Sequence, residues 1–184
     1  AGVNSIQHGG NLTEELMDLL IENDVGFVNT YTIGYQSVFN EWGFLDNEAG
    51  GIQAWTDRGR QVHERALAEN DRRSQRRTDR LGQLRRANEK GVHVGIGTDS
   101  MHGFMPLEME NLVAAGFSPL QAIVAATGIN AQIVGIADEV GTIEVGKYAD
   151  IISIDGRPDE NVQDMEKVSF LMVGGRIQTN LSFR

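Results

Sequence analysis

The stretch VHVGIGTDSMHG, residues 92–103, joins an apolar run to a carboxylate and sets a histidine three residues beyond that carboxylate. In an extended chain alternate side chains lie on opposite faces, so Val94 and Ile96 share one face. Asp99 lies on the other face, which is lined by glycines. The β-branched face suits a layer of helices above it, and the glycine face suits a crowded barrel interior. The pattern predicts a buried strand that ends at Asp99. Asp99 itself is either a catalytic group or a helix cap.

The sequence around this stretch alternates between strand-like and helix-like segments. Strands are expected at 2–9, 25–32 and 92–99, and helices at 12–24, 58–90, 106–116 and 118–136. Thr13 or Asn11 is expected to cap the first helix, and Ser118 with Gln121 forms a capping-box pattern at the last one. This alternation is typical of an α/β fold with a parallel sheet under helices. In such folds the chemistry lies at the carboxyl ends of the strands.

The character of the sequence changes from residue 141 onward. The segments GTIEVGKYADIISID (141–155) and VSFLMVGGRIQTN (168–180) are rich in strand-forming residues and contain glycine turns. This composition predicts a second, β-rich unit. We therefore expect two domains, at 1–140 and 141–184.

Composition limits the function classes. The chain has 184 residues, no cysteine and a formal net charge of −10. Without cysteine, a metal ion must be held by His, Asp or Glu, and the lack of thiols fits a cytoplasmic location. The negative charge argues against nucleic acid and anionic membranes as partners. No apolar run is long enough to span a bilayer, so small-molecule substrates remain.

Two segments allow more than one interpretation. The helix expected at 58–90 holds 11 of the 16 basic residues, yet acidic residues are interspersed and aromatic residues for base stacking are few. A solvated amphipathic helix is therefore favoured over an RNA-binding helix. The glycine-rich, aromatic excursion at 34–51 is a candidate substrate lid, or a small cluster packed over the domain.

The histidines differ in their expected positions. His8 ends the first strand just before a Gly-Gly turn, as Asp99 ends the third, so a metal ligand or base would fit there. His93 lies at the opposite end of its strand, and His63 lies on the basic helix. We interpret the last two as structural and surface residues.

Four segments, taken in order, resemble metal-dependent amidohydrolases, especially imidazolonepropionase-like enzymes and Xaa-Pro dipeptidases. They are AGVNSIQHGG (1–10), GVHVGIGTDS (91–100), AGFSPLQAIVAATGINAQIVGI (115–136) and VGTIEVGKYADIISIDGRP (140–158). The resemblance implies a (β/α)8 barrel to which residues 1–140 contribute strands six to eight. Residues 141–184 would form the C-terminal part of a small β-sandwich.

The resemblance also implies roles for individual residues. His8 corresponds to a metal ligand, and Asp99 to a second ligand that also accepts the proton of the attacking water. The cofactor would be a divalent metal, with zinc favoured, as one or two ions. His102 and Tyr31 would lie on neighbouring rim loops and contact a substrate carbonyl or carboxylate. An ordinary loop hydrogen bond for His102 and a packing role for Tyr31 remain open.

The sequence departs from the family pattern in two respects. Gln7 stands where the family commonly has glutamate, and the ligands of the first, fourth and fifth strands are absent. Because such a barrel needs roughly 250 residues, we expect the missing N-terminal half on this chain or on a partner. A homo-oligomer is left open.

These observations favour a metal-dependent hydrolase of amide or peptide C–N bonds in small substrates, similar to dipeptidases. An imidazolonepropionase-type hydrolase of cyclic amides is less favoured, because GTDSMHGF (97–104) lacks an Asn-Pro-Gly run after Asp99. A noncatalytic half-barrel that serves as a binding module is the alternative outside enzymes.

Overall fold

The computed structural model describes residues 2–32, 61, 72–99 and 104–178. The excursion expected at 34–51, together with His63 and His102, lies outside these residues. The parallel-sheet part comprises β1 (Ser5–Gln7), α1 (Glu14–Glu22), β2 (Gly26–Asn29), α4 (Arg72–Lys90) and β3 (Val94–Ile96). It is followed by α5 (Met105–Ala114), α6 (Pro119–Val124), a π-helical turn (Ala125–Ile129) and α7 (Asn130–Ile133). The antiparallel part comprises β4 (Ile151–Ile154), a 3-10 helix (Val162–Glu166), β5 (Val168–Val173) and β6 (Arg176–Ile177).

The first three strands form a parallel sheet in the order β1-β2-β3. The α/β class and the three strands predicted from the sequence are therefore present, although each strand is shorter than expected. Pairing stops at Gln7, Asn29 and Ile96, one to three residues before the candidate groups. At His8 the backbone leaves the extended region, with a φ of 68°, and this conformation ends the strand.

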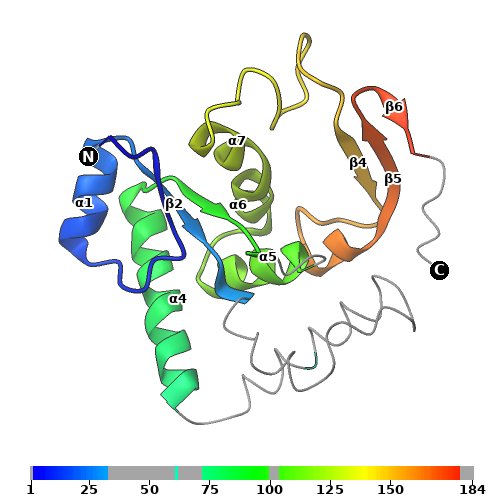
Figure 1. The fold of residues 1–184 in the computed structure, drawn as a ribbon. Coiled ribbons are helices and arrows are strands. Elements are labelled where there is room, and N and C mark those ends of the chain that lie inside the picture. The colour runs from blue at the N-terminus through cyan, green and yellow to red at the C-terminus, as the bar shows by residue number, and fades with distance from the viewer. Residues whose placement is uncertain (1, 33–60, 62–71, 100–103, 179–184) are drawn as a thin grey trace.

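One face of this sheet forms the hydrophobic core. Phe27 pairs in register with Val94, so both side chains lie on that face. The core joins the sheet to three covering helices through Met17 and Leu20 of α1, Leu84 and Ala87 of α4, and Met109 and Leu112 of α5. Figure 1 shows α1 and α4 on the same side of β2, away from α6 and α7. The β-branched face of the 92–99 segment thus packs under helices, as its pattern predicts.

The opposite, glycine-lined face carries α7. A Cβ atom added to Gly26 would lie 2.3 Å from Ile133 Cγ1, and one added to Gly95 would lie 2.3 Å from Asn130 Oδ1. Both glycines are therefore required for the close approach of the helix. In the described part of the chain, the face expected to be a barrel interior is in contact with this helix.

The outer edge of β3 is also occupied. The Asn130 carboxamide accepts a hydrogen bond from Ile96 N at 3.0 Å and donates one to Ile96 O at 2.8 Å. A side chain thus satisfies both backbone groups of Ile96, as a neighbouring strand would.

The helix expected at 118–136 begins as predicted but is interrupted. Ser118 Oγ accepts from Gln121 N, and the Gln121 side chain accepts from Ser118 N, which completes the capping box. The π-helical turn follows, where the Thr127 hydroxyl donates to Ile123 O at 2.8 Å. A side-chain bond of this kind bends a helix because it engages a carbonyl of the preceding turn. Thr13 caps α1 through a bond from Leu16 N.

The last strands form a separate antiparallel sheet in the order β4-β5-β6. In Figure 1 this sheet lies apart from the parallel strands, with α6 and α7 between the two. The β-rich character from residue 141 onward is therefore present, while the domain boundary at 140/141 stays a prediction. Within the described ranges, no helix has the length and apolarity needed to cross a membrane.

Candidate active site

Two of the candidate residues come together at the carboxyl ends of the parallel strands. His8 follows β1 and Asp99 follows β3, and these two strands flank β2. His8 Nδ1 lies 3.9 Å from Asp99 Oδ2, and the side chains are 51% and 38% exposed. An imidazole and a carboxylate therefore face each other where solvent can reach them.

The backbone is unusual at both positions. His8 has a φ of 68° and Asp99 a φ of 46°; Asp24 is the third such non-glycine residue among those described. This left-handed region costs an L-residue roughly 1–2 kcal/mol, and such strain is concentrated at functional sites. The shared conformation at the two strand ends supports a functional interpretation of this edge.

A buried threonine orients the His8 ring. Thr30, which follows β2, has its hydroxyl oxygen 2.8 Å from His8 Nδ1. Among the described residues, both of these ring contacts involve Nδ1, so Nε2 could bind a ligand. In that tautomer Nδ1 carries the proton and donates to Thr30, an arrangement that commonly fixes a metal-binding imidazole.

Arg80 of α4 joins two candidate residues. Its guanidinium donates to His8 O at 3.4 Å and lies 5.0 Å from the centroid of the Tyr31 ring. Tyr31 is only 6% exposed, so its substrate contact stays a prediction beside the packing role that was left open. Sequence reasoning missed Arg80, because nothing in the sequence distinguishes it from the other basic residues of that helix.

A buried glutamate lies behind this edge. The Glu108 side chain of α5 is fully buried and accepts from Thr32 N at 2.5 Å and from Asn29 Nδ2 at 3.1 Å. Burial raises the pKa of Glu108 to about 7, and the hydrogen bonds from residues 31–32 and the charge of Arg80 oppose this shift only in part. Sequence reasoning missed Glu108, although its helical spacing to Leu112 and Ala115 was a usable signal.

The donor set fits part of a metal site. Imidazole and carboxylate are ligands that suit a divalent cation such as zinc. In the segments that the structure describes, no group of three or more His, Asp or Glu residues could hold a metal ion. His8 and Asp99 could therefore supply at most two of the three protein ligands that a catalytic zinc site typically has.

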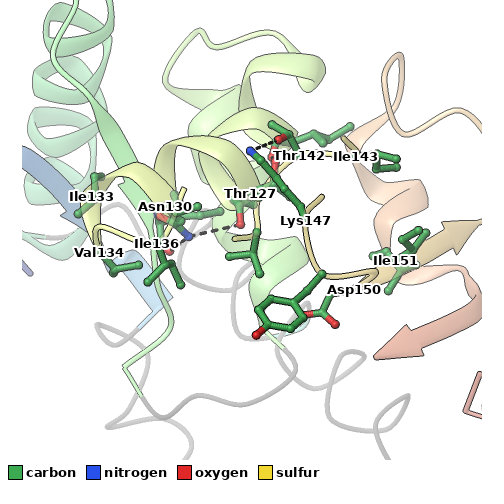
Figure 2. Close-up of a pocket in the computed structure, with 18 of the residues that line it drawn as sticks. Thr127, Asn130, Ile133, Val134, Ile136, Thr142, Ile143, Lys147, Asp150 and Ile151 are labelled. Carbon is green, nitrogen blue, oxygen red and sulfur yellow. Dashed lines mark hydrogen bonds between the residues drawn. The ribbon is translucent and has the colours of Figure 1, made fainter. Parts of the chain in front are cut away.

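A pocket of about 790 Å³ lies elsewhere, between the glycine-lined face, α6–α7 and β4. Figure 2 shows Ile133, Asn130 and Thr127 on one side of it and Ile143, Lys147 and Ile151 on the other. Neither His8 nor Asp99 lines this pocket, although Gln7, which precedes His8, does.

The sequence matches one known family over nearly its whole length. The profile of the amidohydrolase family matches residues 7–178. Imidazolonepropionase from Syntrophobacter fumaroxidans is 36% identical over 84 residues, which cover 42% of this chain and 20% of that protein.

Solved structures are similar as well. A Xaa-Pro dipeptidase, crystallised with methionine in its active site, is 30% identical, with a TM-score of 0.68 over 97% of this chain and 40% of that one. The ochratoxinase of A. niger is 22% identical, with a TM-score of 0.68 over 96% of this chain and 37% of its own, and shows the fold alone. The chain thus spans at most 40% of the length of these three relatives.

Proposed function

Because the chain belongs to the amidohydrolase family, we propose that it forms part of the active site of a metal-dependent hydrolase. The enzyme cleaves amide or peptide C–N bonds in small substrates, and Xaa-Pro dipeptides are the substrates proposed. The similarity to the Xaa-Pro dipeptidase supports this choice. Residues outside this chain complete the barrel and the ligand set.

The observation that carries the proposal is the 3.9 Å approach of His8 Nδ1 and Asp99 Oδ2 at the carboxyl ends of β1 and β3. His8 would hold the cation through Nε2, because the Thr30 hydroxyl already contacts the ring at Nδ1. A divalent cation, when bound, supplies the Lewis acidity that makes water nucleophilic near neutral pH. Asp99 would hold the same cation, and its carboxylate would accept the proton of the attacking water and pass it to the leaving amine.

Finer features belong to the same proposal. Zinc is the proposed metal because imidazole and carboxylate are among its usual ligands. His102 and Tyr31 are proposed to contact the substrate. The cysteine-free composition supports a cytoplasmic location.

A second candidate function is the hydrolysis of a cyclic amide. The 36% identity to imidazolonepropionase over 84 residues favours it. The same pair of residues serves both reactions, because each adds water to an amide carbonyl and breaks its C–N bond.

The experiment uses the full-length protein that contains these residues. We expect hydrolysis of Xaa-Pro dipeptides that chelation abolishes and divalent metal restores. Asp99→Asn should lower kcat/KM by roughly 100-fold or more, since it removes the proton acceptor. The control is Asp138→Asn, the same change at an exposed residue with no expected effect.

Three outcomes would change the conclusion. Hydrolysis of imidazolonepropionate, but of no dipeptide, would select the second candidate. Full activity of Asp99→Asn would remove this residue from the chemistry. If neither substrate class is cleaved and no metal is retained, the protein is a noncatalytic binding module.

A further inference from the structure

We propose that Glu108 is a positioning residue for His8, acting through the segment at the end of β2 that holds the imidazole ring. This inference rests on the proposed role of His8. Glu108 touches neither His8 nor Asp99 in the contacts described above, so its effect must be indirect.

Glu108 forms a clamp, made of two hydrogen bonds, on both sides of Thr30. One carboxyl oxygen accepts from the Asn29 side chain at 3.1 Å and the other from Thr32 N at 2.5 Å. All four residues are at most 2% exposed, so water does not compete for these bonds. The carboxyl group therefore fixes the course of the chain before and after Thr30.

The chain beyond β2 needs a contact of this kind because it leaves the sheet. The sheet pairing of β2 ends at Asn29, so beyond it the sheet ladder no longer supports the backbone. A buried N–H without a partner costs about 1–3 kcal/mol. Glu108 supplies the acceptor for Thr32 N from a neighbouring helix and thereby ties this segment to α5.

Thr30 connects the clamp to the imidazole of His8. The Thr30 hydroxyl lies 2.8 Å from His8 Nδ1, so the position of Thr30 sets the orientation of the ring. Arg80 contacts the same region by donating to His8 O. Groups behind a metal ligand typically change affinity or activity by about 10–100-fold when they are mutated.

The test exploits the two different bonds of the carboxyl group. Glu108→Gln keeps the side-chain volume and an acceptor for Thr32 N, but presents an amide donor to the Asn29 donor. The double variant Asn29→Asp/Glu108→Gln reverses both partners and restores a donor–acceptor pair with the original charge. Glu89→Gln makes the same chemical change at an exposed residue of α4 and is the matched control.

The measurements are made on the full-length protein. The ¹⁵N NMR signals of the His8 ring, assigned by their loss in His8→Gln, report the bond to Thr30 whether or not a substrate is known. We expect Glu108→Gln to shift these signals and to lower kcat roughly 10–100-fold, with KM changed less than about twofold. The double variant should return the signals and most of the lost kcat, and Glu89→Gln should change neither.

Thr30→Val provides a second, independent variant. If Glu108 acts through Thr30, Thr30→Val by itself shifts the His8 signals and lowers kcat. Adding Glu108→Gln to it then lowers kcat no further. Unshifted His8 signals in folded Glu108→Gln would overturn the inference. Additive losses of kcat in Thr30→Val/Glu108→Gln would overturn it as well. Absence of any hydrolytic activity would instead overturn the proposed function. The positioning role of Glu108 would still be tested by the His8 ring signals, which do not depend on activity.

Discussion

At the scale of single residues, Glu108 gives the protein a pH dependence opposite in sign to that of an ion-paired surface carboxylate. Its pKa is about 7 in the fold, against 4.5 for an ordinary glutamate. Between these values the folded state holds the proton and the unfolded state releases it. The contribution of Glu108 to stability is therefore complete below about pH 4.5 and declines as the pH rises through 7.

The prediction concerns the difference between the native protein and Glu108→Gln. The free energy of unfolding of the native protein should fall by about 3 kcal/mol, from this group alone, between pH 4.5 and 8. The variant should lack this decline. Urea unfolding of both full-length proteins at several pH values measures the difference, and parallel pH profiles would contradict it.

Sequence and structure can be compared most directly at this scale. The approach of His8 and Asp99 could be predicted, because a polar residue after each apolar strand lies at the common carboxyl edge of a parallel sheet. The partners of Glu108 could not. They depend on how α5 packs against the end of β2, which no local pattern specifies.

At the scale of elements, the edge of β3 depends on one side chain of α7. Asn130→Ala removes both bonds to Ile96 and leaves an N–H and a carbonyl group partly buried without partners. We expect a loss of about 1–3 kcal/mol in the free energy of unfolding. Gln132→Ala, at an exposed position of the same helix, is the control and should change stability by less than about 0.5 kcal/mol. Equal effects of the two variants would show that the edge does not need this amide.

The contact between α7 and the sheet also depends on the absence of a side chain. In Gly95→Ala the new methyl group would lie 2.3 Å from Asn130 Oδ1 and 2.9 Å from Ile133 Cδ1. The helix must move, at a cost of about 1–3 kcal/mol. Gly10→Ala, where no atom lies within 4 Å of the added group, should be tolerated. Thermal unfolding ranks the two, and a stable Gly95→Ala protein would contradict the close approach.

Helix starts could be predicted from the sequence, but the interruption after α6 could not. Ser118 and Gln121 form the expected capping box because that motif acts within four residues. The π-helical turn comes where Thr127 bonds to Ile123 O and where Gly128 lies near Gly141. The second of these contacts joins segments that only the tertiary fold brings together.

At the scale of the whole molecule, much apolar surface is exposed around the antiparallel sheet. Large apolar side chains are exposed on the connection after α7 and on all three strands: Ile143, Val145, Tyr148, Ile152, Val173 and Ile177. Several of them line the 790 Å³ pocket shown in Figure 2. Large exposed apolar patches mark interaction surfaces or a tendency to aggregate.

We therefore predict that the 184 residues, produced alone, are aggregated or oligomeric, bind zinc weakly and hydrolyse no dipeptide. Adding the N-terminal half expected from the resemblance should give a protein that does not aggregate, binds zinc tightly and hydrolyses dipeptides. Light scattering, zinc titration and a dipeptide assay on both proteins provide the test. A monomeric 184-residue protein with tight zinc binding and amidase activity would contradict this prediction.

His8 and Asp99 follow β1 and β3, two strands that do not pair with each other. Neighbouring strands lie about 4.8 Å apart, so these two strands are separated by roughly twice that distance, with β2 between them. The gap between the two donor atoms therefore depends on the twist of β2 as well as on the donors themselves. A substitution in β2 that changes this twist would therefore change the spacing of the two proposed ligands without replacing either of them.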